Sequence, residues 1–292
     1  MTIKNTLHKY QQRVDAYLDD TLLSDSIEPR LQEAMRYALF NGGKRVRPIL
    51  VYMVNQMLDG KLEDADVAAG AIECVHSYSL VHDDLPAMDD DDLRRGKPTC
   101  HIAFDEATAI LAGDALQCAG FELLTLDTTH PGRNLAMVKV LAKASGDSGM
   151  VVGQAFDLSH VGKALTLAQL EAMHKHKTGA LLNAAVDLGA LSSGCTDGET
   201  FKQLRRYGDA IGLAFQVKDD ILDIEGDTET IGKPQGSDVE QNKPTYPALL
   251  GMSGAKDKLS QLHSEAISAL QPFGDAAQPL VELADFIVYR DH

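Results

Sequence analysis

Apolar residues recur three or four positions apart along most of the chain, and the apolar-polar alternation typical of strands is scarce. Pro29 fits the first turn of a helix that residues 41–43 end, and Pro48 opens another that continues to Leu58. Residues 48–53 alone would also suit a buried strand, but the longer periodicity favours helix. Further helices are predicted at residues 67–84, 103–126, 134–156, 167–191, 199–224 and 255–291.

The breaks between these helices are short, and no Pro/Ser-rich linker divides the chain. Residues 128–132 and 192–195 have the composition of turns. We therefore predict an all-α fold, a helical bundle in a single domain spanning residues 1–292.

Composition narrows the classes of function. The 292 residues include 43 Asp and Glu against 27 Lys and Arg, a net charge of −16, which argues against nucleic-acid binding and against anionic membranes. The four cysteines are far apart and lack zinc-ligand spacing, so we expect reduced thiols. The first residues lack the apolar segment of a signal peptide, and no run of ~18 apolar residues occurs. These features predict a cytoplasmic protein without membrane insertion.

Two acidic motifs depart from ordinary surface charge. In the first, Pro86 cannot continue a regular helix, so Asp83 and Asp84 end one, and Asp89 lies on a turn that can fold back toward Asp83. Few carboxylates in such a place suit Mg²⁺, which is bound by a few carboxylates together with substrate phosphate oxygens. A solvated acidic loop is the alternative for this motif taken alone.

The second acidic motif, residues 216–223, lies within an apolar helical stretch. Asp219 and Asp223 are one helical turn apart and share a face with Gln216. Carboxylates without a positively charged partner are energetically costly in apolar surroundings. A functional bound cation is therefore the simpler explanation for this motif.

Residues 42–48 carry the opposite charge. Gly42 and Gly43 allow close approach of an anion, and Lys44 and Arg47 supply charge before the helix at Pro48. This pattern predicts a diphosphate site, with a basic surface turn as the alternative. His76, Ser79 and Asp83 share one face of the predicted helix that ends at the first acidic motif.

Together these motifs resemble the isoprenyl diphosphate synthase family. The resemblance extends over motifs from residue 42 to 247, in family order, and rests on residues 42–48, 83–89 with 94–96, 177–179, 216–223, 232–234 and 243–247. It implies a helical bundle around a deep cavity, a homodimer, and condensation of isopentenyl diphosphate with dimethylallyl and geranyl diphosphate to farnesyl diphosphate. The partners are thus small isoprenyl diphosphates.

The resemblance also assigns roles to single residues. Asp83, Asp89 and Asp219 would bind several Mg²⁺ ions that bridge the allylic diphosphate, and Asp84, Asp220 and Asp223 would act on the metals through water. The allylic diphosphate would be bound by the side chains of Arg94, Lys177, Thr178, Gln216 and Lys233, and less certainly by Lys243, which precedes an unexpected proline. The isopentenyl diphosphate site would comprise Lys44, Arg47, His76 and Arg95. Lys177, Thr178 and Gln216 would also stabilise the carbocation.

We expect product length to depend on side chains of the helix before Asp83. Ser79 lies one turn, ~5.4 Å, before Asp83, where an elongating chain must pass, and Tyr78 is bulky enough to close the cavity below a fifteen-carbon product. Packing of Tyr78 in the core is the alternative. The competing functions are geranyl or geranylgeranyl diphosphate synthesis, terpene cyclisation, and a non-catalytic subunit. The basic segment, the absence of Trp and the two intact Asp motifs argue against the last two.

Overall fold

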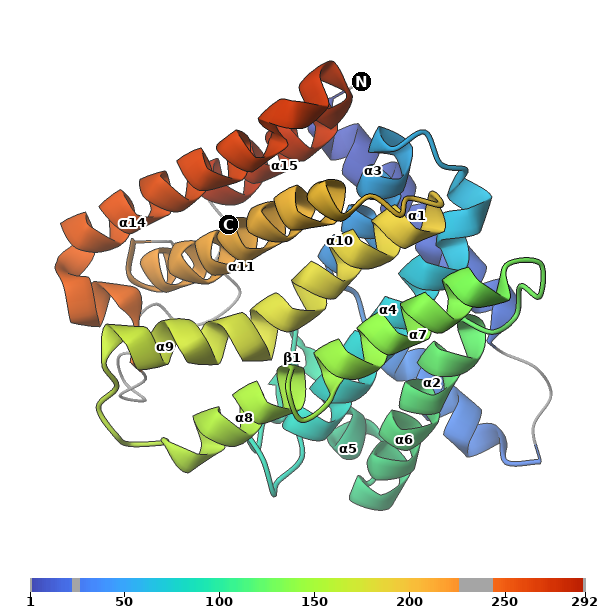
Figure 1. Ribbon diagram of the computed structural model, residues 1–292. Coiled ribbons are helices and arrows are strands. Elements are labelled where there is room, and N and C mark those ends of the chain that lie inside the picture. The colour runs from blue at the N-terminus through green and yellow to red at the C-terminus, as the bar shows by residue number, and fades with distance from the viewer. Residues whose placement is uncertain (1, 23–26, 226–243, 291–292) are drawn as a thin grey trace. The chain divides into compact units, whose positions relative to one another are not determined.

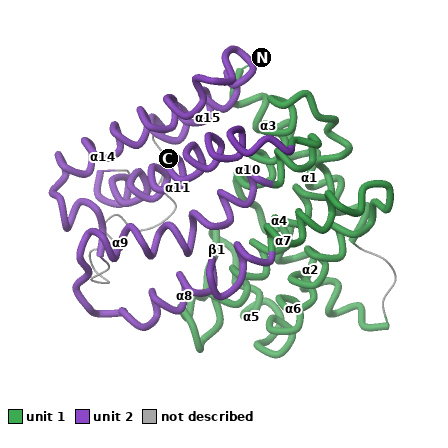
Figure 2. Tube along the Cα trace, viewed as in Figure 1, with its two compact units in different colours: residues 1–141, 188–195 green, residues 142–187, 196–292 purple. Residues whose placement is uncertain are grey.

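The computed structural model describes residues 2–22, 27–225 and 244–290, and these residues are almost entirely helical (Figure 1). The chain divides into two compact units, coloured separately in Figure 2. Unit 1 comprises Met1–Leu141 and Leu188–Cys195, and unit 2 comprises Ala142–Asp187 and Thr196–His292. The all-α prediction is confirmed. The single domain stays a prediction.

Unit 1 contains the N-terminal helices and a small hairpin. Its elements are α1 (Ile3–Thr21), α2 (Pro29–Phe40), α3 (Val46–Met57), α4 (Leu62–Asp83), β1 (Leu93–Arg94), β2 (Lys97–Pro98), α5 (Cys100–Ala103), α6 (Glu106–Leu123) and most of α7 (Pro131–Ser145). Unit 2 holds the rest of the helices. They are α8 (Met150–Ser159), α9 (Leu167–His174), a π-helical turn (Lys175–Gly179), most of α10 (Ala180–Ser192), α11 (Gly198–Glu225), α14 (Tyr246–Leu270), a 3-10 segment (Gln271–Ala277) and α15 (Gln278–Tyr289).

Helix α4 is the centre of unit 1 and packs against α3 and α6. Small residues let the backbones approach: a Cβ on Gly120 of α6 would lie 2.9 Å from the carbonyl oxygen of Ala71 and from Val75. Such close packing of helices around α4 fixes the direction of its last turn. That turn carries Asp83.

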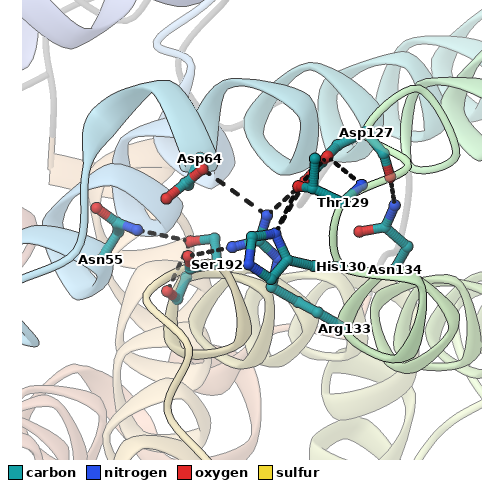
Figure 3. A network of polar contacts seen from close by, with 9 residues as sticks. Asn55, Asp64, Asp127, Thr129, His130, Arg133, Asn134 and Ser192 are labelled. Atoms are coloured by element: carbon teal, nitrogen blue, oxygen red, sulfur yellow. Dashed lines mark hydrogen bonds and ion pairs between the residues drawn. The ribbon is translucent and has the colours of Figure 1, made fainter.

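A polar network ties together the opposite end of unit 1 (Figure 3). The guanidinium of Arg133 lies 2.8 Å from the carboxylate of Asp127 and 3.7 Å from that of Asp64, and it donates to the Ser192 carbonyl at 3.3 Å. The side chains of Ser192 and Asn55 are 2.9 Å apart. Ion pairs and hydrogen bonds that link α3, α4, α7 and α10 in this way favour one arrangement of these helices, because another arrangement would break them.

In unit 2, α11 packs against α14 and α15. Val217 and Ile221 of α11 belong to an apolar cluster with Leu259 and Tyr246 of α14. The apolar positions of residues 216–223 are therefore core positions, as the sequence indicated, and they hold the second acidic motif in a fixed orientation.

Several predicted boundaries are wrong for local reasons. The predicted helix over residues 134–156 is two helices, because the chain leaves helical geometry at Gly149 (φ −132°, ψ −127°). The predicted helix over 103–126 starts only at Glu106, where Asp105 accepts a hydrogen bond from the amide of Thr108 at 2.7 Å. Helix α3 begins at Val46, two residues before Pro48.

The C-terminal part also differs from its prediction. Helix α14 starts at Tyr246 rather than near residue 255, and Gly251 interrupts it with a φ of 71°. The segment predicted as one helix up to residue 291 changes to 3-10 geometry at Gln271, where Pro272 and Gly274 disfavour an α-helix. None of the helices among the described residues is long and apolar enough to cross a membrane.

Candidate active site

The first acidic motif has the predicted backbone. Helix α4 ends at Asp83, and Asp84 follows as its C-cap. The amide of Asp89 donates to the carbonyl oxygen of Asp83 at 2.8 Å, so the turn after Pro86 folds back onto the helix end. Asp83 is partly exposed and Asp89 is exposed. Both carboxylates therefore lie at the surface of unit 1, where a cation can reach them.

Asp84 differs from these neighbours because it is buried, with 3% of its surface exposed. Both its oxygens accept from Nε of Arg94 at 2.9 Å. Burial raises the pKa of the Asp84 carboxyl, and the bonded guanidinium opposes that shift. The partner of Asp84 in this structure is therefore Arg94. This arginine, which the resemblance assigns to the allylic diphosphate, is already paired with a carboxylate.

Arg94 and Arg95 are placed by a hairpin that the sequence analysis missed. Strands β1 and β2 are antiparallel, and Arg95 and Gly96 between them have φ values of 56° and 75°. Positive φ at both central residues is the geometry of a two-residue I′ turn. The glycine is a recognisable turn signal, but the left-handed arginine is not.

The basic segment forms a compact cationic site in unit 1. Gly42 and Gly43 have φ values of 90° and 130°, and Arg95 donates to the carbonyl oxygen of Gly42. A Cβ on Gly43 would lie 2.7 Å from Nη1 of Arg95, so a side chain at this position would displace the guanidinium. The sequence predicted that this segment binds an anion. In the structure, its two glycines also lie against the positively charged guanidinium of Arg95.

Arg47 and His76 meet in the same region, with Nη1 of Arg47 3.1 Å from Nε2 of His76. Burial, with the charges of Arg47 and Arg95, lowers the pKa of His76 well below its usual value. Burial also lowers the pKa of Arg47 to about 10, and Arg95 adds to the shift. Nε of Arg47 is buried without a hydrogen-bond partner in the described part of the chain. Concentrated positive charge with an unsatisfied donor suits an anionic ligand.

Arg45 is excluded from that role. Its guanidinium is buried between the carboxylates of Asp15 at 2.8 Å and Glu73 at 2.9 Å. Lys44 is exposed beside it. A pocket in unit 1 lies beside the first acidic motif, and it is lined in part by Asn41, Ser77, Asp84, Arg94 and Arg95.

The second acidic motif lies on α11 in unit 2. Asp219 is 41% exposed at its side chain and accepts a bond from Arg290, whose own side chain is 4% exposed. Asp220 is buried and accepts from the amide of Tyr246 at 2.9 Å, and Asp223 is also buried. The most accessible carboxylate of the three is thus Asp219, the one assigned to metal.

Lys177 and Thr178 lie in the π-helical turn between α9 and α10. The hydroxyl of Thr178 donates to the side-chain oxygen of Gln216 at 3.1 Å. Nζ of Lys177 is 2.6 Å from the carboxylate of Asp157 on α8. The three residues assigned to carbocation stabilisation therefore come together within unit 2, and Asp157 joins them.

The chain-length residues lie on α4. Tyr78 is buried, burial raises the pKa of its phenol, and its ring packs edge-on against His82 with centroids 5.8 Å apart. The hydroxyl of Ser79 donates to the carbonyl oxygen of His76 at 2.8 Å, and Ser79 is partly exposed. Lys233 and Lys243 lie outside the described residues.

The donor set fits magnesium. No group of three or more His, Cys, Asp or Glu side chains within residues 2–22, 27–225 and 244–290 is arranged to hold a metal ion by itself. The turn that brings Asp89 back to Asp83 supplies two carboxylates within unit 1. Mg²⁺ is commonly held by one or two carboxylates with substrate phosphates completing its shell.

Sequence reasoning missed two polar partners of the site, Asp157 and Arg290. Asp157 lies just beyond the predicted end of its helix at residue 156, and Arg290 is 71 residues from Asp219 in sequence. Neither belongs to a motif that spacing alone brings out. Only the tertiary structure pairs them with Lys177 and Asp219.

Comparison with known proteins identifies the family. The sequence matches the polyprenyl synthetase family over residues 28–276. It is 51% identical to a farnesyl diphosphate synthase of Haemophilus influenzae, covering 97% of each chain, and 46% identical to a chloroplastic geranylgeranyl pyrophosphate synthase of Capsicum annuum, covering 96% of this chain and 76% of that one. A geranyltransferase structure from Legionella pneumophila superposes with a TM-score of 0.87 at 39% identity, covering 98% and 96%. The chain belongs to the polyprenyl synthetase family and is a prenyltransferase.

Proposed function

We propose that this protein is a farnesyl diphosphate synthase that extends dimethylallyl and geranyl diphosphate with isopentenyl diphosphate. The cationic site of Arg47, His76 and Arg95 carries this proposal. A terpene cyclase ionises one diphosphate and has no need of a second anion site, whereas a condensing enzyme binds two diphosphates. The 51% identity to a relative named farnesyl diphosphate synthase supports the fifteen-carbon product.

The allylic diphosphate is the group that leaves when its C–O bond breaks. Mg²⁺ held by Asp83, Asp89 and Asp219 would neutralise charge on this leaving group. Lys177 and Arg94 donate to its oxygens, and because its charge grows as the bond breaks, these donors stabilise the transition state more than the ground state. Asp220 and Asp223 would orient water around the bound cations.

The carbocation left behind needs partial negative charge without a nucleophile. The amide oxygen of Gln216, held by the Thr178 hydroxyl, supplies such a dipole. Lys44, Arg47, His76 and Arg95 hold isopentenyl diphosphate while its double bond attacks the cation. The proton then lost passes to the released diphosphate, which accounts for catalysis without a dedicated side-chain base.

Incubation of the purified chain with dimethylallyl diphosphate, isopentenyl diphosphate and Mg²⁺, followed by chromatography of dephosphorylated products, tests the proposal. Farnesol is the expected main product, and chelation of the metal should abolish it. Predominant geraniol or geranylgeraniol would instead indicate a ten- or twenty-carbon synthase. Cyclic hydrocarbon formed from geranyl or farnesyl diphosphate without isopentenyl diphosphate would indicate a cyclase, and an inactive folded chain would indicate a non-catalytic subunit.

Arg94 and Arg95 should serve different substrates, because their guanidinium groups have different partners, Asp84 and Gly42. We expect Arg95→Ala to raise mainly the KM for isopentenyl diphosphate and Arg94→Ala mainly that for the allylic substrate, each by about tenfold. Lys97→Ala, an exposed cation on the same hairpin, is the control and should change neither. Equal effects of both arginine variants on both substrates would contradict the division.

The protein is further proposed to be a cytoplasmic homodimer. Helix α6 supports dimerisation, because Ala107, Ile110 and Leu111 on it are exposed, the last two by 44% and 57%. Exposed apolar side chains on one helix suit a partner copy of the same chain.

Leu111→Glu places a charge in the middle of this α6 surface, and burial of that charge in an interface would be costly. We therefore expect the variant to shift from dimer to monomer in light scattering coupled to gel filtration. Lys139→Glu, a larger charge change at an exposed position of α7, is the control and should leave the molecular mass unchanged. A dimer that survives Leu111→Glu would place the interface elsewhere.

A further inference from the structure

Helix α8 contacts Lys177 at both ends of the lysine residue. A Cβ on Gly153 would lie 2.2 Å from the backbone nitrogen of Lys177 and 2.6 Å from its Cα, so the two backbones touch. One turn later on the same helix face, Asp157 lies 2.6 Å from the Lys177 ammonium. In Figure 1 the α8 helix runs beside the α9 segment that leads into this turn.

Such a double contact restricts a flexible side chain. A lysine has four rotatable bonds and binds anions as a point charge, so its aim depends on its surroundings. The π-helical turn at Lys175–Gly179 and the bond from Thr178 to Gln216 fix the backbone on the other side. Asp157 then determines where the ammonium lies.

We propose that Asp157 is a positioning residue that aims the Lys177 ammonium at the leaving diphosphate. The inference rests on the proposed function. An ammonium has three donors, so it can keep its bond to Asp157 and donate to a diphosphate oxygen at the same time. The negative charge of Asp157 weakens anion binding at Lys177, while the fixed geometry favours the transition state. The repulsion of the anion affects KM, and the fixed geometry of the ammonium affects kcat.

Asp157→Asn is the direct test, because the amide is nearly isosteric and lacks the charge. We expect kcat to fall about tenfold, since a misplaced group costs mainly transition-state stabilisation. The KM for the allylic diphosphate should rise less than twofold or fall, because a repelling charge has gone. Asp157→Glu keeps the charge and should recover at least a third of the wild-type kcat.

The control is a matched ion pair in the same unit. Glu171 and Lys258 lie 2.7 Å apart with side chains 24% and 21% exposed, against 35% and 27% for Asp157 and Lys177. Glu171→Gln should therefore cost similar stability, as followed by thermal unfolding, without changing kcat. Partly exposed ion pairs of this kind make a modest contribution to stability, so all three variants should fold.

A double-mutant cycle shows whether Asp157 acts through Lys177. In a Lys177→Ala background, the further change Asp157→Asn should alter kcat by less than twofold. The inference is overturned if Asp157→Asn alone keeps kcat within twofold of wild type, if it raises only KM, or if its effect persists without Lys177. An inactive wild-type chain would instead refute the proposed function, so the two failures are distinguishable.

Discussion

Replacing Asp219 with Asn should lower kcat by about 10²–10³ while the protein stays folded. Asp219 is the most accessible carboxylate of the second acidic motif, and the amide that replaces it would carry no charge to hold the proposed Mg²⁺. Its side chain is 41% exposed, so the nearly isosteric change disturbs little packing. Steady-state kinetics and circular dichroism of the purified variant measure both parts of the prediction.

The ion pair between Asp219 and Arg290 requires a control, since Asp219→Asn also breaks that pair. Arg290→Gln breaks it from the other side and leaves the carboxylate in place. The Arg290 guanidinium packs 4.3 Å from the centroid of the Phe215 ring and donates to the Phe215 carbonyl at 3.4 Å. Arg290→Gln should therefore lose stability but keep far more activity than Asp219→Asn. Activity of Asp219→Asn within threefold of wild type would refute the assignment to metal.

A metal titration separates the carboxylate's role from a general loss of activity. If Asp219 binds Mg²⁺, the Mg²⁺ concentration for half-maximal rate should rise in Asp219→Asn and stay near the wild-type value in Asp187→Asn. Asp187 is a suitable second control because it is buried and pairs with Arg205 at 2.8 Å on the same unit. Its loss tests what a broken ion pair alone does.

The sequence predicted best those features that are encoded locally. Pro86 ends α4 at Asp83 and folds the chain back to Asp89, because proline restricts the residue before it and cannot extend a helix. The apolar positions around Asp219 also predicted that it lies on a core helix, because helical periodicity can be recognised without tertiary information.

Pairings between distant residues were beyond the sequence. Asp84 and Arg94 are ten residues apart, and Arg94 lies in the first strand of a hairpin whose turn contains a left-handed Arg95 that no turn rule singles out. Asp157 and Lys177 meet only because Gly153 lets α8 touch the π-helical turn. Charge complementarity among many acidic and basic residues leaves too many alternatives, and packing selects among them.

Product length offers the second large effect, expected from Ser79→Phe. Ser79 lies one turn, ~5.4 Å, before Asp83 on α4, and it is partly exposed. If the growing chain passes this level of the helix, as we propose, a larger side chain there would obstruct it. We expect the variant to release mainly geranyl diphosphate, in place of farnesyl diphosphate, under excess isopentenyl diphosphate. Ser79→Ala removes the bond to the His76 carbonyl without adding volume and should keep the wild-type product.

Tyr78 tests the opposite change. Its ring is buried and packs against His82, so Tyr78→Ala leaves a cavity at the level below Ser79. Part of the product should then grow to twenty carbons, at a cost in stability of about 3–5 kcal/mol. Tyr78→Phe keeps the volume and should keep farnesyl diphosphate as the main product. Chromatography of dephosphorylated products distinguishes the outcomes, and wild-type distributions from both Ser79→Phe and Tyr78→Ala would mean that other residues close the cavity.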